Sequence, residues 1–67
     1  MTCNILEVIN GGSVWLLLAS NGRRIVEQVI EPRYMSDIVD GEGLSHPSDL
    51  VGREIEISED GMDIAFV

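Results

Sequence analysis

Three dipeptides with a strong turn preference divide the apolar parts of the chain into short segments: Gly11-Gly12, Asn21-Gly22 and Asp60-Gly61. Each is a favoured two-residue loop of a β-hairpin, because such loops need positive φ angles, which Gly adopts freely and Asn or Asp tolerates. The residues around these turns are rich in Ile, Val and Leu, which favour strands. The sequence therefore predicts a mainly β protein, with a three-stranded meander over residues 1–30 and a hairpin over residues 53–67.

If each loop of the meander has two residues, the residues at equal distances on either side of the loop are paired. Val8 then faces Trp15, and Trp15 faces Gln28. One face is predicted to form the core and consists of Leu6, Val8, Trp15, Leu17, Ala19, Val26 and Ile30. The opposite face consists of Ile5, Ile9, Val14, Leu16, Leu18, Ile25 and Val29, with Glu7 and Glu27 among them. Since both faces are largely apolar, both are expected to be at least partly covered by other parts of the structure or by a partner.

The C-terminal hairpin alternates much more cleanly. An Asp60-Gly61 loop pairs Glu59 with Met62 and Ile57 with Ile64. One face is apolar and consists of Ile55, Ile57, Ile64 and Phe66. The opposite face is mostly charged and consists of Glu54, Glu56, Ser58, Asp63, Ala65 and Val67. This pattern predicts a hairpin that covers the core with one side and exposes the other to solvent.

Residues 31–52 contain both prolines and three of the seven glycines. We expect a short helix over residues 34–39 and one helical turn that begins at Ser48-Asp49 and ends at Gly52. Three strands, a helical or irregular connection and a hairpin match the order of a small five-stranded, partly open barrel of the OB or SH3-like kind. The alternative is an α+β sheet with one short helix. Either way, residues 1–67 are predicted to form a single small acidic domain.

Composition excludes several classes of function. The chain has 12 acidic and 4 basic residues, a net charge of -8 and no lysine, so Schiff-base chemistry is excluded and direct binding of nucleic acid is not expected. The longest apolar run has six residues, Val14 to Ala19, which is too short to cross a membrane. Cys3 is the only cysteine, and the first residues lack the pattern of a signal peptide, so a reducing cytoplasm is the expected location.

The candidate chemical groups are weak. In the predicted register Glu7 and Glu27 flank Leu16 from two strands, which puts their Cβ atoms roughly 10 Å apart, wide for one metal ion. The carboxylates of residues 37–42 do not have the spacing of a calcium-binding loop. The Ser, His and Asp side chains of residues 45–49 are too close in sequence for a catalytic triad. We therefore expect no catalytic residue, no metal site and no cofactor.

Charge distribution is the feature that points to a partner. Of the 12 acidic residues, 11 lie from Glu27 onward, together with only two arginines. The predicted partner-binding residues are Glu54, Glu56, Glu59, Asp60 and Asp63. They predict a non-enzymatic protein-interaction module, an adaptor, regulator or inhibitor, that presents an acidic face to a basic protein surface. A phage or mobile-element protein that blocks a nucleic-acid-binding host protein by imitating phosphate charge would have these properties. Solubility is the simpler explanation of the same charge.

Two alternative functions remain open at this point. One is a homodimeric structural subunit, joined through the apolar face that contains Ile5, Ile9, Leu18 and Ile25. The other is a small metal-dependent enzyme that uses surface carboxylates, either Glu7 and Glu27 or the acids of residues 37–42.

Overall fold

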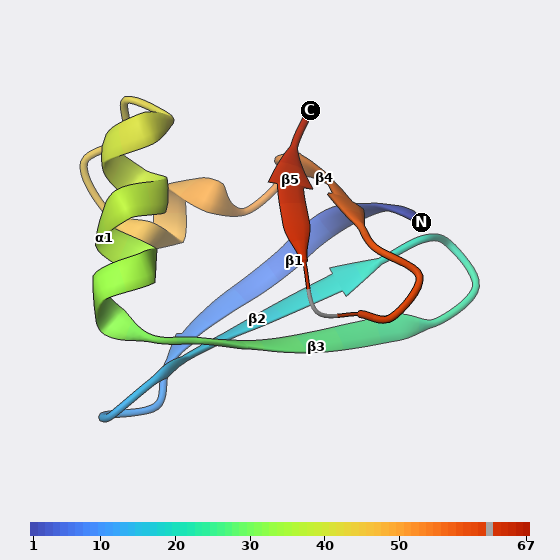
Figure 1. Ribbon diagram of the computed structural model, residues 1–67, viewed down its shortest axis with the longest axis horizontal. Coiled ribbons are helices and arrows are strands. Elements are labelled where there is room, and N and C mark those ends of the chain that lie inside the picture. Colours follow the sequence, from blue (N-terminus) through green and yellow to red (C-terminus); the bar gives the residue numbers. More distant parts are fainter. Residues whose placement is uncertain (62) are drawn as a thin grey trace.

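A computed structural model describes residues 1–61 and 63–67 of the chain. The elements, in order, are β1 (Thr2–Asn10), β2 (Trp15–Ser20), β3 (Ile25–Ile30), α1 (Pro32–Gly41), a 3₁₀ helix η1 (Pro47–Leu50), β4 (Glu54–Ile57) and β5 (Ile64–Phe66) (Figure 1). All strand pairs are antiparallel, and the five strands form one sheet in the order β3-β2-β1-β4-β5. The prediction of a mainly β protein with a meander and a C-terminal hairpin is confirmed.

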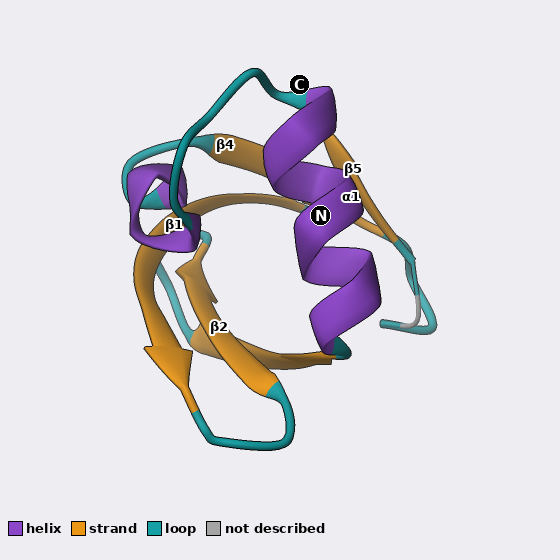
Figure 2. Cartoon of the chain, turned by 90° about the vertical axis from the view of Figure 1, so that its left-hand side faces the viewer, coloured by secondary structure: helices purple, strands orange, loops and turns teal. Residues whose placement is uncertain are grey.

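The sheet is curved but open. Its edges are β3 and β5, which do not pair with each other within the described residues. In Figure 2 the strands form an incomplete ring, and α1 lies at its open side. Closure into a barrel is therefore not confirmed, and the arrangement fits the predicted alternative, a sheet with one short helix. Across the gap, the side-chain amide of Gln28 in β3 donates to the carbonyl of Gly61 at 2.9 Å.

The two loops of the meander contain four residues each, 11–14 and 21–24, so the predicted two-residue registers are wrong. In each loop the flanking residues pair with each other, as Asn10 with Trp15 and Ser20 with Ile25. From Glu7 onward, the pairing of neighbouring strands in the meander shifts by two positions relative to the prediction. A shift by two keeps every side chain on its face. The predicted faces of β2 and β3 are therefore correct although their registers are not.

Both four-residue loops are built in the same way. The residue before each loop accepts a hydrogen bond from a backbone N–H two positions on: Asn10 Oδ1 from Gly12 at 2.9 Å, and Ser20 Oγ from Gly22 at 3.1 Å. Such side-chain turns let Asn and Ser replace a backbone turn bond. Gly12 and Gly22 then adopt φ angles of 93° and 92°, which disfavour any residue with a Cβ.

A β-bulge interrupts β1 at Leu6. The pairing to β2 runs from Ile5 with Ala19 directly to Glu7 with Leu18, so Leu6 is an extra residue in β1. One extra residue exchanges the two faces for the part of β1 that precedes it. Ile5 is accordingly 1% exposed and Leu6 is 48% exposed. The prediction that placed Leu6 in the core and Ile5 on the opposite face is wrong.

The bulge lies beside the segment that precedes β4. The Ile5 carbonyl accepts from the Gly52 N–H at 2.8 Å, and the Ile5 N–H donates to the Arg53 carbonyl at 2.9 Å. These bonds tie the backbone of Ile5 to a segment nearly fifty positions later in the chain. A contact of this range is not visible in the local sequence pattern, which explains why the bulge was not predicted.

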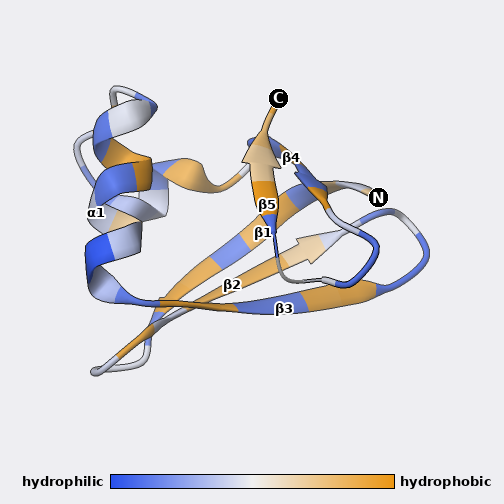
Figure 3. Ribbon diagram, viewed as in Figure 1, coloured by the Kyte–Doolittle hydropathy of each residue, from blue (hydrophilic) through white to orange (hydrophobic). Residues whose placement is uncertain are grey.

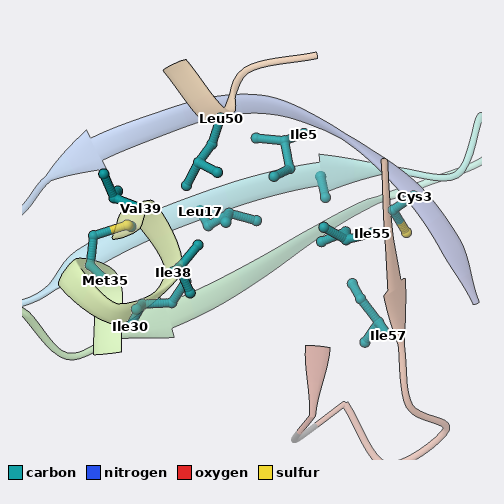
Figure 4. Close-up of a cluster of buried hydrophobic side chains, with 11 residues drawn as sticks. Cys3, Ile5, Leu17, Ile30, Met35, Ile38, Val39, Leu50, Ile55 and Ile57 are labelled. Atoms are coloured by element: carbon teal, nitrogen blue, oxygen red, sulfur yellow. The ribbon is translucent and has the colours of Figure 1, made fainter. Parts of the chain in front are cut away.

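The core lies between the inner face of the sheet and the helices (Figure 4). Its buried residues are Cys3, Ile5, Leu17, Ala19, Ile30, Met35, Ile38, Val39, Leu50, Ile55 and Ile57. Helix α1 contributes three of them at the i, i+3, i+4 spacing of one helix face, and it begins with Pro32 in its first turn, a favoured position. The short helix predicted over residues 34–39 is confirmed and extends further at both ends. The predicted helical turn near Ser48 is η1, which contributes Leu50.

The C-terminal hairpin has the predicted register, with Ile55 opposite Phe66 and Ile57 opposite Ile64. Its apolar side faces the core, where Ile55 and Ile57 are fully buried. The predicted pairing of Glu59 with Met62 lies outside the described residues. Gly61 has a φ of 75°, as a tight loop at this position requires.

Candidate functional site

The outer face of the sheet, which points away from α1, consists of two regions. The acidic region is formed by the hairpin β4–β5, and the apolar region is formed by β1, β2 and β3. Figure 3 shows hydrophobic residues along most of β2 and hydrophilic residues in the loop between β4 and β5. These two regions contain nearly all of the residues that the sequence singled out for binding.

The acidic region contains all five predicted partner-binding residues, and all five are exposed. Glu54 and Glu56 are two positions apart on β4 and therefore share its outer face. Asp63 precedes β5, and its backbone pairs with that of Ser58 at 2.9 Å. Glu59 and Asp60 lie in the loop, where the Ser58 hydroxyl donates to the Asp60 carboxylate. The structure thus brings these carboxylates to one side and one end of a single hairpin.

Glu56 is the residue of the acidic region that is bound to the N-terminus of the chain. Its carboxylate accepts from the Thr2 hydroxyl at 2.5 Å and from the Met1 amino group at 2.9 Å. The hydrogen bond from Thr2, followed by the hydrogen bond and positive charge of the amino group, lowers the pKa of Glu56 below its usual value. Glu56 therefore joins the hairpin to the start of β1 as well as adding charge to the outer face.

The apolar region has two rows of side chains that run across three strands. The first row is Ile9, Leu16 and Val29, and the second is Glu7, Leu18 and Glu27. The two carboxylates therefore flank Leu18 rather than the predicted Leu16, because the strand pairings are shifted by two positions. Val29 is 62% exposed, and Ile25, further along β3, is 64% exposed.

The predicted dimer face is only partly present. Ile9, Leu18 and Ile25 remain on the outer side of the meander, as predicted. Ile5 is buried in the core, because the bulge at Leu6 reverses its direction. Leu6 takes its place among the exposed apolar residues.

The other candidate groups do not form a catalytic or metal-binding cluster within the described residues. Within residues 1–61 and 63–67, no three His, Cys, Asp or Glu side chains are grouped so that they could hold a metal ion. Residues 37–41 belong to α1 rather than to a loop, and Glu42 forms an ion pair with Arg53. Cys3 is buried in the core.

His46 and its neighbours cap η1. The His46 ring accepts through Nδ1 from the Ser48 N–H at 3.1 Å, and the Asp49 carboxylate accepts from the His46 N–H at 3.1 Å. This reciprocal arrangement is a capping box, with His in the position usually held by Ser or Thr. The side chains of His46 and Asp49 therefore stabilise the start of this turn.

One feature that the sequence reasoning missed is an open pocket of about 360 Å³ between α1 and the start of β2. It is lined by Trp15, Pro32, Met35, Ser36, Val39, Asp40, Ser45 and Pro47. These residues come from three separate segments of the chain, so no local sequence motif predicts the pocket.

No helix within the described residues is both long enough and apolar enough to span a membrane. Comparison with known protein families gives no match to any family model, and searches of curated proteins and of solved structures give no significant match either. The function must therefore be argued from the faces and the pocket themselves.

Proposed function

We propose that this protein is a non-enzymatic interaction module, an adaptor, regulator or inhibitor, that binds a basic protein surface through the outer face of its sheet. One observation carries the proposal. None of the five strands, all within the described residues, contains Lys or Arg, although their outer face carries four glutamates. The strands therefore bring acidic and no basic side chains to this face, and a basic surface is its electrostatic complement.

The two regions of the face have different expected roles. Exposed carboxylates such as Glu54 and Asp63 speed the encounter with a positive partner and make binding sensitive to salt. Exposed apolar side chains such as Ile25 and Val29 gain stability on contact, by about 25 cal/mol for each Å² removed from water. Binding would therefore be steered by the acidic region and strengthened by the apolar region.

Three finer proposals accompany this function. The protein acts in the cytoplasm, and its carboxylates imitate phosphate charge to block a nucleic-acid-binding protein, as a phage or mobile-element inhibitor would. The curved sheet is a partly open barrel of the OB or SH3-like kind, which the contact between Gln28 and Gly61 across its gap supports.

The test is affinity capture from a bacterial lysate with three matched baits. The first is the parent protein, the second carries Glu54→Gln and Asp63→Asn, and the third carries Glu31→Gln and Asp37→Asn. Both variants lose two negative charges at exposed positions, but only the second changes the outer face. We expect a basic protein that the parent and the third bait capture at low salt, and that is lost at 1 M salt, where charges are screened beyond about 3 Å.

Equal capture by the second and third baits would show that net charge alone is responsible and would contradict the proposal. Failure of the parent to capture any protein would do the same. A melting temperature that rises with calcium, magnesium, manganese or zinc would instead support a small metal-dependent enzyme, because a ligand at a hundred times its Kd adds about 2.7 kcal/mol.

A homodimer is the second candidate, and the exposure of Ile25 and Val29 favours it. The face corrected for the bulge contains Leu6, Ile9, Leu18 and Ile25. Glu7 and Glu27 weaken this candidate, because two copies of one face bring like charges together. Sedimentation at micromolar concentration decides between the two, since a monomer contradicts the homodimer and leaves the interaction module.

A further inference from the structure

The pocket between α1 and β2 has the size and composition of a small-ligand site. Its volume of about 360 Å³ lies within the usual range of roughly 300–1,000 Å³ for such sites. Trp15, at the start of β2, forms one side, and residues 32–40 of α1 form the other. It is separate from the outer face of the sheet, so an inference about it is independent of the interaction function.

The apolar walls of the pocket are held in place by the core. Met35 and Val39 are buried residues of α1, and Trp15 is half-buried and packs against the same cluster. Pro32 and Pro47 complete the apolar lining, and their rings restrict the backbone at the start of α1 and of η1. The walls are therefore formed before any ligand arrives.

Three polar side chains on the lining lack partners inside the protein. They belong to Ser36, Asp40 and Ser45, and within the described part of the chain none of these side chains forms a hydrogen bond or ion pair. Ser36 and Asp40 are four residues apart on α1 and so lie on the same side of the helix, one turn from each other. All three are exposed to solvent and are therefore accessible to a ligand that enters the pocket.

The electrostatics of this pocket favour a cation. Asp40 is the only charged residue of the lining, and it is an anion. It also lies in the last turn of α1, where the helix dipole is negative and no basic residue compensates it. The ring of Trp15 adds a third attraction, because the face of an indole binds cations, most strongly when they are poorly hydrated.

We propose that this pocket binds an alkylammonium group, with the charge near the Asp40 carboxylate and the Trp15 ring and the alkyl part against Pro32 and Pro47. The lining contains no Lys or Arg, so an anion finds no counter-charge there. The same chemistry is available from a free small molecule or from a lysine side chain of another protein.

Trp15 makes the proposal directly testable, because it is the only tryptophan of the chain and its fluorescence reports on the pocket. The probes are choline, its uncharged isostere 3,3-dimethylbutan-1-ol, and a lysine residue blocked at both backbone ends. We expect a saturable fluorescence change, with the ammonium probe binding at least about fivefold more tightly than the uncharged isostere. A response to choline alone indicates a small molecule, and a response to blocked lysine alone indicates a protein side chain.

Two variants of α1 provide the control. Asp40→Asn removes the charge from the pocket, and Asp37→Asn removes an exposed charge of the same helix outside the lining. We expect Asp40→Asn to weaken the ammonium probe about fivefold to tenfold and Asp37→Asn to change its affinity less than about twofold. The proposal is overturned if neither ammonium probe gives a saturable change, if the isostere binds equally well, or if the two variants behave alike.

Discussion

The hairpin β4–β5 and the meander β1–β3 show two ways in which a sequence specifies a sheet. In β4 of the hairpin, apolar and charged residues alternate strictly, and the loop dipeptide and the alternation agree on one register. In the meander, both faces are apolar, so alternation does not choose among registers. In the meander, the register is set by side-chain hydrogen bonds in the loops and by the bulge in β1. The hairpin thus has one apolar face, which packs on the core, whereas the meander has a second apolar face that the core does not cover.

The sharpest test of this difference is a pair of neighbouring substitutions on either side of the bulge. Ile5→Ala is expected to lower the free energy of unfolding by about 2–5 kcal/mol, because Ile5 is fully buried. Leu6→Ala is expected to lower it by less than about 1 kcal/mol, because that side chain is half exposed. Urea unfolding followed by circular dichroism measures both. The reverse order would show that β1 has no bulge and that the predicted faces were right.

Substitutions of loop glycines are expected to cause the next largest loss of stability. Gly22→Val in the meander and Gly61→Val in the hairpin should each cost more than about 1 kcal/mol, because both residues have positive φ angles that a β-branched side chain disfavours. Gly41→Ala is the control, since Gly41 ends α1 without a positive φ and should gain up to about 1 kcal/mol. Thermal melts compare the three. If only Gly61→Val destabilises, the four-residue loop at residues 21–24 is wrong.

Substitutions on the outer face should leave stability nearly unchanged in both regions. Val29→Thr in the meander and Glu54→Gln in the hairpin are each expected to stay within about ±0.5 kcal/mol, because both side chains are exposed. The two substitutions should differ in their effect on the affinity for the captured partner. Glu54→Gln should make this affinity less dependent on salt concentration, and Val29→Thr should lower it at every salt concentration. A large loss of stability from Val29→Thr would mean that this face is already covered.

The smallest expected effect is the titration of Glu56. Its pKa in the folded protein is lower than in the unfolded chain, so its bonds to Thr2 and the Met1 amino group stabilise the fold above the unfolded pKa. That contribution is lost as the pH falls through the folded pKa. Carboxyl chemical shifts in an NMR titration measure the pKa directly. Thr2→Val should raise it, and an unchanged value would mean that the hydroxyl does not hold the carboxylate.

The sequence predicted what depends on local pattern. The register and both faces of β4–β5, the inward residues of β2 and β3, and both short helices follow from alternation, loop residues and helix signals. The acidic region follows from charge alone. The local pattern did not predict the bulge, because the backbone of Ile5 is hydrogen-bonded to residues 52–53, far along the chain. The local pattern did not predict the pocket either. Packing of α1 on the sheet brings together its three lining segments, which are Trp15, residues 32–40 and residues 45–47.

The bulge gives residue 6 an unusual kind of importance. Its side chain contacts solvent and can be replaced, but its place in the chain keeps Ile5 and Cys3 directed inward while Glu7 and Ile9 point outward. A deletion at this position would reverse the direction of the side chains in the first half of β1 relative to the core. Evolution is therefore free to vary the identity of residue 6 but not to lose the residue, and related chains should differ here by substitution while keeping the length of β1 constant.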